Sequence, residues 1–96
     1  DGRVSAVVGT HTHVPTADHR VLSRGTAYVS DLGMTGPLDS VIGFEPETVL
    51  PRFMNGLPTR FAVGSGPVFF NAVRFDLDPG SGAAHSVARF SRIIEM

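Results

Sequence analysis

Residues 4–13 read Val4-Ser5-Ala6-Val7-Val8-Gly9-Thr10-His11-Thr12-His13 and join an apolar, valine-rich run to a polar loop. The run Val4–Val8 is short and bounded by Gly9, which is typical of a strand buried on both faces. The polar loop Gly9–Asp18 follows it directly. In α/β folds, ligand sites gather where strands end and loops begin. We therefore expect the functional site at this junction.

Two histidines at alternate positions, His11 and His13, are the sharpest chemical feature of this loop. On an extended segment their side chains would point to the same side, about 6.5–7 Å apart along the chain. Each could give one imidazole nitrogen to a metal ion, and two-metal hydrolases hold their ions roughly 3.5–4 Å apart. Gly9 would let the backbone approach the metals closely. Two histidines cannot complete even one tetrahedral site, and the pair could also be an incidental feature of a polar loop.

Strands and one helix are predicted beyond this loop. Thr26–Ser30 is a second strand candidate, and Asp31–Gly43 is rich in Gly, Asp and Pro and indicates an irregular surface loop. A helix is predicted over Pro46–Leu57, since Pro46 suits a first helical position. Pro51 would either kink this helix or mark where its regular part begins. The apolar residues of the helix recur at spacings of three and four: Val49, Leu50, Phe53, Met54 and Leu57.

A C-terminal β-hairpin is predicted from alternation on either side of a turn. Apolar and charged residues alternate in Phe69–Leu77, a strong turn signal covers Asp78–Gly82, and Ala84–Ile94 returns. Four phenylalanines at helix or strand periods are interpreted as core: Phe53, Phe69, Phe70 and Phe75. The fold class is therefore α/β, mixed α+β within these residues, with strands at both ends and one helix.

Composition bounds the class of protein. Ninety-six residues suffice for one small domain, yet 42% are hydrophobic and mean hydropathy is +0.11. This surplus indicates apolar surface that meets the rest of a longer chain or a partner subunit, a homo-oligomer being one form. Asp1-Gly2-Arg3 lacks an initiator Met and runs straight into Val4–Val8, so we expect residues 1–96 to be cut from the middle of a larger α/β protein. A formal charge of −1 indicates no nucleic-acid patch. No apolar run is long enough to span a membrane. The absence of Cys is compatible with a cytoplasmic location.

The segment Val7–Val14 resembles the last metal-binding motif, G-[TH]-H-T-H, of the calcineurin-like metallophosphoesterases. Further stretches are similar to the YmdB-like bacterial branch of that superfamily: Pro15-Thr16-Ala17-Asp18, Gly25-Thr26-Ala27-Tyr28 and Ser30-Asp31-Leu32-Gly33-Met34-Thr35-Gly36-Pro37. The likeness continues weakly through the helix and into Phe70–Asp78, so it covers most of the chain.

This resemblance implies a four-layer metallophosphatase-type β-sandwich flanked by helices. It implies hydrolysis of phosphodiesters, notably 2′,3′-cyclic nucleotides, with two divalent ions such as iron or manganese. His11 would ligate one metal and His13 the other. The family's remaining ligands (an Asp, a Glu, two Asn and a further His) and its catalytic His beside an Asn lie upstream of the matching region. The resemblance thus implies that residues 1–96 are the C-terminal part of a single metallophosphoesterase domain. No catalytic residue is assigned within them, and alone they are expected to be inactive.

Other residues receive weaker functional assignments. Thr10, Thr12 and Asp31 could line the pocket or bind the ligand histidines, with Asp31 a candidate acceptor for an imidazole N–H. Loop shaping is the favoured interpretation for Asp31 and its neighbouring glycines. Three further features are interpreted as structural: Asp18 capping a turn beside a solvated His19, a surface His85, and a Gly64-Ser65-Gly66 loop that lacks the Lys of a P-loop.

One alternative from a different class stays open at this point. The chain could be a non-catalytic β-rich interaction module that binds a partner through its apolar surplus, with incidental histidines.

Overall fold

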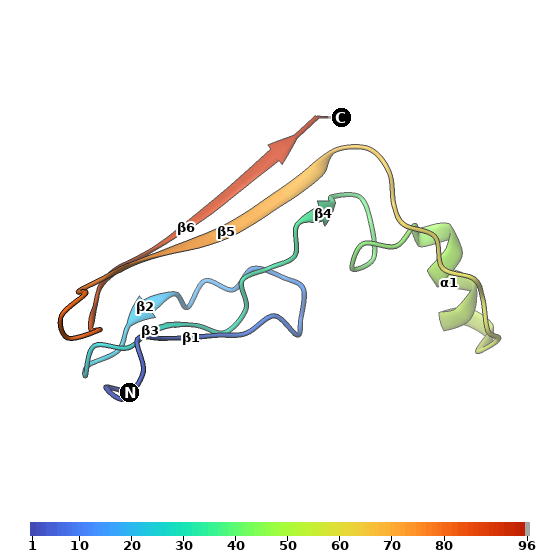
Figure 1. The fold of residues 1–96 in the computed structure, drawn as a ribbon. Helices are drawn as coiled ribbons and strands as arrows, with labels where there is room; N and C mark the ends of the chain where they lie inside the picture. The colour runs from blue at the N-terminus through green and yellow to red at the C-terminus, as the bar shows by residue number, and fades with distance from the viewer. Residues whose placement is uncertain (96) are drawn as a thin grey trace. The chain divides into compact units, whose positions relative to one another are not determined.

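The computed structural model describes residues 1–95, and Figure 1 traces their path. The chain divides into two compact units: residues 1–34 with 71–91, and residues 35–70 with those from 92 onward. Two small sheets and one helix make up the described residues, so the mixed α+β class is confirmed.

A three-stranded sheet lies in the first unit in the order β1-β3-β2. Strand β1 (Ala6–Val8) pairs in parallel with β3 (Ala27–Val29), and β2 (Arg20–Val21) pairs antiparallel with β3. Two parallel strands therefore end at the same edge, and the residues that follow β1 and β3 emerge side by side (Figure 1). Both predicted strands are confirmed, whereas β2 was not anticipated.

The burial expected for the first strand is wrong for the described residues. Val7 and Val8 remain 45% and 44% exposed, because β1 has β3 on one side only and is an edge strand of this sheet. The central strand β3 is the buried one: Ala27 and Val29, two residues apart and on one face, are completely inaccessible to solvent.

The second sheet has the order β4-β5-β6 and contains the predicted hairpin. Strands β5 (Val68–Leu77) and β6 (Ala84–Ile94) flank a turn closed by Asp78, whose carboxylate accepts bonds from the N–H and hydroxyl of Ser81 at 3.0 and 2.6 Å. Both β5 and β6 contribute residues to each unit. The hairpin prediction is confirmed.

Strand β4 (Gly36–Pro37) corrects the expectation of an irregular surface loop over Asp31–Gly43. It pairs antiparallel with the start of β5, Gly36 opposite Phe69. Asp31, at the start of the same stretch, is buried rather than on the surface. Abundant Gly and Pro suppress regular structure in general, but they do not exclude a two-residue edge strand.

Helix α1 (Pro46–Asn55) begins at the predicted residue and ends two residues early. Gly56 adopts φ 70°, and its N–H bonds to the Arg52 carbonyl at 2.8 Å, which closes the helix with a left-handed cap. Pro51 lies inside the helix rather than at its start. Among the described residues, no helix has the length and apolar character that crossing a membrane requires.

The apolar stripe of α1 is not the core that its periodicity suggested. Val49 is 5% exposed, but Phe53 is 75% exposed. Phe70 on β5 is likewise exposed. The interpretation of Phe53 and Phe70 as core is therefore wrong within the described residues, because a helical period shows which residues share a face and not what covers that face.

Candidate functional site

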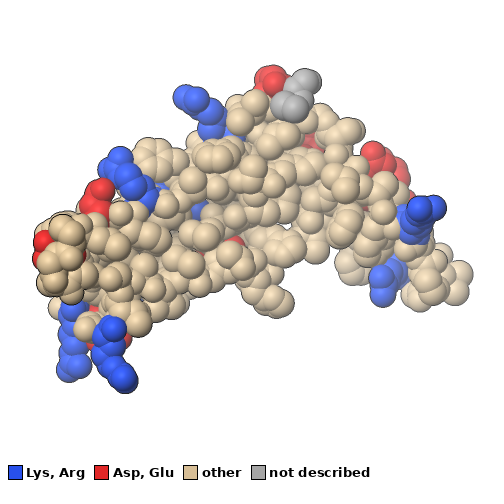
Figure 2. Space-filling view, viewed as in Figure 1, with Lys and Arg blue, Asp and Glu red and all other residues tan. Residues whose placement is uncertain are grey.

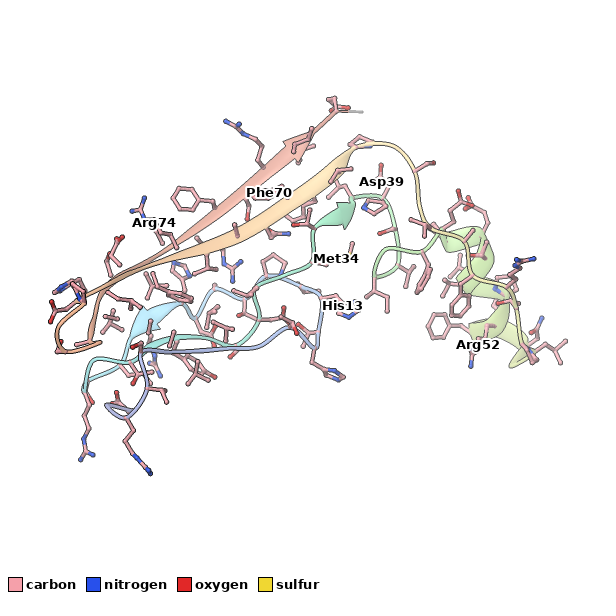
Figure 3. All side chains as sticks on the ribbon, in the orientation of Figure 1. His13, Met34, Asp39, Arg52, Phe70 and Arg74 are labelled. Carbon is pink, nitrogen blue, oxygen red and sulfur yellow. The ribbon has the colours of Figure 1, made fainter. Side chains whose placement is uncertain are left out.

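The loop that follows β1 carries His11 and His13, and its backbone is turned rather than extended. His13 has φ 66°, in the left-handed region that a non-glycine residue rarely enters. The prediction of an extended segment is therefore wrong, and the placement of both side chains on one side stays a prediction. Figure 3 shows His13 at the tip of this loop.

A buried carboxylate, that of Asp31, explains the turn. Its Oδ2 accepts the Thr12 N–H at 2.6 Å, the Thr12 hydroxyl at 2.5 Å and the His13 N–H at 3.2 Å. In an extended strand, successive N–H groups point in opposite directions and cannot share one acceptor. A turned backbone can instead point successive N–H groups inward, which makes a small anion-binding concavity called a nest. Here the bound anion belongs to the protein itself.

Asp31 is well suited to remain ionised in this position. Hydrogen bonds hold its pKa below the ordinary value, that of the Thr12 hydroxyl first, while burial acts in the opposite direction. Its other oxygen, Oδ1, accepts the Gly33 N–H at 2.8 Å. The carboxylate thus orders the backbone of two loops at once, the one after β1 and the one after β3.

Backbone bonds join the same two loops along their length. The Gly9 N–H donates to Val29 at 3.2 Å, and the Gly9 carbonyl accepts the Leu32 N–H at 2.8 Å. A Cβ added at Gly9 would lie 2.0 Å from the Ser30 carbonyl oxygen, an impossible contact. Gly9 is therefore required by the approach of one loop to the other, which is a different reason from the close approach to metals that the sequence suggested.

The hairpin supplies a second set of bonds that sequence reasoning missed. Arg89 on β6 donates from Nη1 to the Leu32 carbonyl at 2.8 Å and from Nη2 to the Asp31 carbonyl at 2.7 Å. Asn71 on β5 donates to the Met34 carbonyl at 2.7 Å, and the Met34 N–H donates to the His13 carbonyl at 3.1 Å (Figure 3). No local pattern marks these residues, because their partners lie 57, 58 and 37 positions away.

A second carboxylate, that of Asp18, supports the far end of the loop. It accepts bonds from the Thr16 hydroxyl at 2.8 Å, from the Ser30 N–H at 3.0 Å and from the Ser30 hydroxyl. These bonds, the Ser30 hydroxyl foremost, lower the pKa of Asp18 from 3.8 to about 2. Asp18 therefore joins the loop to Ser30 at the end of β3, twelve residues away, and its expected role as the cap of a local turn stays a prediction.

The two remaining histidines differ from each other. His85 on β6 is exposed, as predicted. His19 is half-buried, and its Nδ1 is shielded from solvent without a hydrogen-bond partner among residues 1–95. The prediction of a solvated His19 is wrong in that respect.

His11 and His13 fit part of a metal site in their accessibility and their support. Both residues are exposed, as is Thr10 beside them, and the backbone of His13 is held by the nest around Asp31. The set of donors is incomplete, because within residues 1–95 no three His, Cys, Asp or Glu side chains gather closely enough to hold an ion. The assignment of His11 and His13 as ligands stays a prediction.

The chain carries eight Arg and no Lys side chains, together with nine Asp and Glu side chains. Figure 2 shows Arg side chains, in blue, and Asp and Glu side chains, in red, among uncharged residues on the face drawn. This distribution agrees with the formal charge of −1.

Comparison with known proteins identifies relatives of this chain. A family profile described as YmdB-like protein matches residues 1–90. The 2′,3′-cyclic-nucleotide 2′-phosphodiesterase of Bacillus subtilis (strain 168) is 51% identical over 89 residues, which cover 93% of this chain and 34% of the relative.

Two crystal structures resemble the chain closely. One, described as a novel phosphatase from Mycoplasma pneumoniae, superposes with a TM-score of 0.92 at 36% identity, over 99% of this chain and 34% of that one. The other, a hypothetical protein from Thermus thermophilus, gives a TM-score of 0.91 at 42% identity, over 98% of this chain and 36% of that one. The chain thus spans about a third of the length of each of these three proteins.

Proposed function

This chain belongs to the YmdB-like protein family, and on that premise we propose that it is part of a metal-dependent phosphodiesterase to which it contributes two ligands, His11 and His13. The observation that carries the proposal is the ordered loop. Two accessible imidazoles project from a backbone that is held by a buried carboxylate and joined to the neighbouring loop. Such support is what a ligand pair requires, since hydrogen bonds from surrounding groups orient the ligands of protein metal sites.

Relatives support the type of reaction. The Bacillus subtilis relative is named for a cyclic-nucleotide phosphodiesterase activity, and the structural neighbour from Mycoplasma pneumoniae is described as a phosphatase. Both names describe hydrolysis of a phosphoester. We extend that reaction type to this protein and take 2′,3′-cyclic nucleotides as its proposed substrates.

Each residue of the loop has a defined part in this proposal. A pair of divalent ions such as iron or manganese, when bound, supplies polarisation of the phosphoryl group and a water of lowered pKa. His11 and His13 hold the ions through neutral ring nitrogens. Asp31 fixes the backbone between and beside them, and Thr10 and Thr12 border the pocket. The other ligands would come from parts of the protein outside residues 1–96.

Replacement of each histidine in the full-length protein tests the proposal. We expect His11→Ala and His13→Ala each to lower metal content, measured by elemental analysis, because each removes a nitrogen bound to an ion. Hydrolysis of a 2′,3′-cyclic nucleotide should fall by more than about 100-fold, beyond the range typical of losing a group that only supports a ligand.

His85→Ala is the matched control, since His85 is exposed on the hairpin. It should keep wild-type metal content and rate. Wild-type metal content and turnover in both His11→Ala and His13→Ala would overturn the proposal and favour the non-catalytic interaction module. A wild-type protein that hydrolyses a simple aryl phosphodiester but not a 2′,3′-cyclic nucleotide would correct the proposed substrate. The proposed type of reaction would remain.

A further inference from the structure

We propose that Arg89 of β6 is a positioning residue for the His11–His13 loop, acting through the turn at Asp31 and Leu32. The inference rests on the proposed metal role of that loop. Arg89 touches neither histidine in the bonds described, and its effect passes through two successive sets of hydrogen bonds.

The first set joins the guanidinium to the turn. Nη1 and Nη2 reach the carbonyls of two consecutive residues, Leu32 at 2.8 Å and Asp31 at 2.7 Å. Both bonds are charge-assisted and short for N–H···O bonds. A planar fork with fixed donors can hold two adjacent carbonyls at once, which sets the position of the turn as well as its distance from β6.

The second set of hydrogen bonds joins the turn to the His11–His13 loop. The residue whose carbonyl Arg89 holds is Asp31, and the carboxylate of Asp31 gathers Thr12 and His13. A shift of the Asp31 backbone would carry its carboxylate with it. Since two N–H groups and one hydroxyl converge on a single oxygen, a shift of that oxygen away from them would lengthen all three bonds and release the left-handed conformation of His13.

The burial of Arg89 indicates that its place is maintained at a cost. The side chain is half-buried, and its Nε is shielded from solvent with no hydrogen-bond partner within residues 1–95. A buried unsatisfied donor is destabilising and requires an explanation. We explain the unpaired Nε by the position of the guanidinium, whose other two nitrogens hold the turn at Asp31 and Leu32.

Asn71 is a second residue of the hairpin that holds the segment from Asp31 to Met34. Asn71 on β5 bonds the Met34 carbonyl at 2.7 Å, and the Ser91 hydroxyl on β6 donates to the Asn71 side-chain oxygen at 2.8 Å. Arg89 and Asn71 thus hold both ends of the segment from Asp31 to Met34. Arg89 is the one whose partner carries the carboxylate of the nest.

Arg89→Met and Arg89→Lys in the full-length protein test the inference, with Arg92→Met, an exposed cation on the same strand, as the matched control. Amide hydrogen exchange is measured on metal-free protein, and Mn²⁺ affinity by titration. We expect exchange at Thr12 and His13 to quicken at least about tenfold in both Arg89 variants, while the Ala27 amide of β3 stays protected. Mn²⁺ affinity should fall about 10–100-fold. Lysine should not rescue either readout, because it lacks the fork.

Two outcomes would overturn the inference. One is wild-type exchange at Thr12 and His13 in Arg89→Met, whatever happens to metal binding. The other is a uniform loss of protection that includes Ala27, with unchanged Mn²⁺ affinity of the folded protein, since that result describes a purely structural residue. If Arg89→Met does not fold, the same criteria apply to Arg89→Lys.

The two readouts also separate this inference from the function proposed above. Faster exchange confined to Thr12 and His13 in the Arg89 variants, in a protein whose wild type binds no Mn²⁺, would support the role of Arg89 in ordering the loop and would overturn the metal role. Normal Mn²⁺ binding with unaltered exchange in the Arg89 variants would leave the metal role standing and overturn the inference.

Discussion

The loop after β1 and the helix α1 show two opposite relations between sequence and burial. The loop is polar and exposed at its histidines, yet it rests on Asp31, which is 1% exposed and satisfied by several donors. The helix is apolar at regular spacings, yet most of its apolar side chains are exposed to solvent. A hollow of about 490 Å³ lies beside the helix and is lined in part by Phe44, Phe53 and Phe61.

The difference shows where geometry is specified in this chain. At the loop, directional hydrogen bonds fix individual atoms, and a displacement of about an ångström breaks them. At the helix, only the shared face is defined, and non-directional apolar contacts tolerate variation. A ligand pair needs the first kind of support, so we expect substitutions at the loop to have larger and more local effects than those at the helix.

The largest effect is expected for Gly9→Ala. The added methyl would meet the Ser30 carbonyl oxygen at 2.0 Å, so the two loops must separate, and we expect a loss of about 3 kcal/mol in the free energy of unfolding. Urea denaturation of the full-length protein measures it. Gly80→Ala is the control, because its methyl would meet only an ordinary contact at 3.7 Å, and it should change stability by less than about 0.5 kcal/mol. Equal stabilities for the two variants would show that the loops do not depend on their close approach.

Asp31→Asn should come next. The amide keeps the shape of the side chain but presents a weaker acceptor to Thr12 and His13, so metal affinity should fall about 10–100-fold. Titration with Mn²⁺ measures the change. Asp39→Asn alters an exposed carboxylate and should bind Mn²⁺ as the wild type does. Unchanged Mn²⁺ affinity in Asp31→Asn would show that the proposed metal site does not depend on the hydrogen bonds to the Asp31 carboxylate.

Val49→Ala and Leu50→Ala compare two apolar neighbours on the helix. Val49 is 5% exposed and Leu50 is 50% exposed. Removing two buried methyl groups at Val49 should cost about 1.5 kcal/mol, whereas Leu50→Ala should cost no more than about 0.5 kcal/mol. Unfolding midpoints in urea give both values. A larger loss at Leu50 would show that its exposed face is covered in the full-length protein.

The smallest effect is expected from Asp18, and it depends on pH. Its folded-state pKa is about 2 against an ordinary value of 3.8, so the carboxylate stabilises the fold above about pH 4. This contribution is lost as the pH falls toward about 2. The stability difference between wild type and Asp18→Asn should therefore shrink over that window, measured as urea midpoints from about pH 7 down to about pH 2. A constant difference would contradict the cause assigned to the pKa.

Local signals in the sequence were sufficient for several elements and for the candidate ligands. The hairpin, both main strands and the start of α1 at Pro46 follow from alternation, turn residues and proline geometry. Each of these signals acts over a few residues. The position of His11 and His13 just after a strand was also readable, because the strand and the loop are adjacent in sequence.

Features that depend on distant residues could not be read in the same way. The turned backbone at His13 is imposed by Asp31, 18 residues away, and the turn at Asp31 is held by Arg89 from 58 positions away. Exposure of Phe53 and Val7 likewise depends on which surfaces meet them. Periodicity predicts a face but carries no information about its partner.

Taken alone, the sequence determined the kinds of element, the hairpin turn and the two histidines at alternate positions just after a strand. Tertiary structure decided that those histidines stand on a turned backbone, that Gly9 is needed for contact with Ser30, and that Asp31 and Arg89 support the loop. The physical reason is range. Backbone propensity and turn chemistry act between near neighbours in sequence. A buried carboxylate and a guanidinium form their hydrogen bonds only after the chain has brought distant segments within hydrogen-bonding distance.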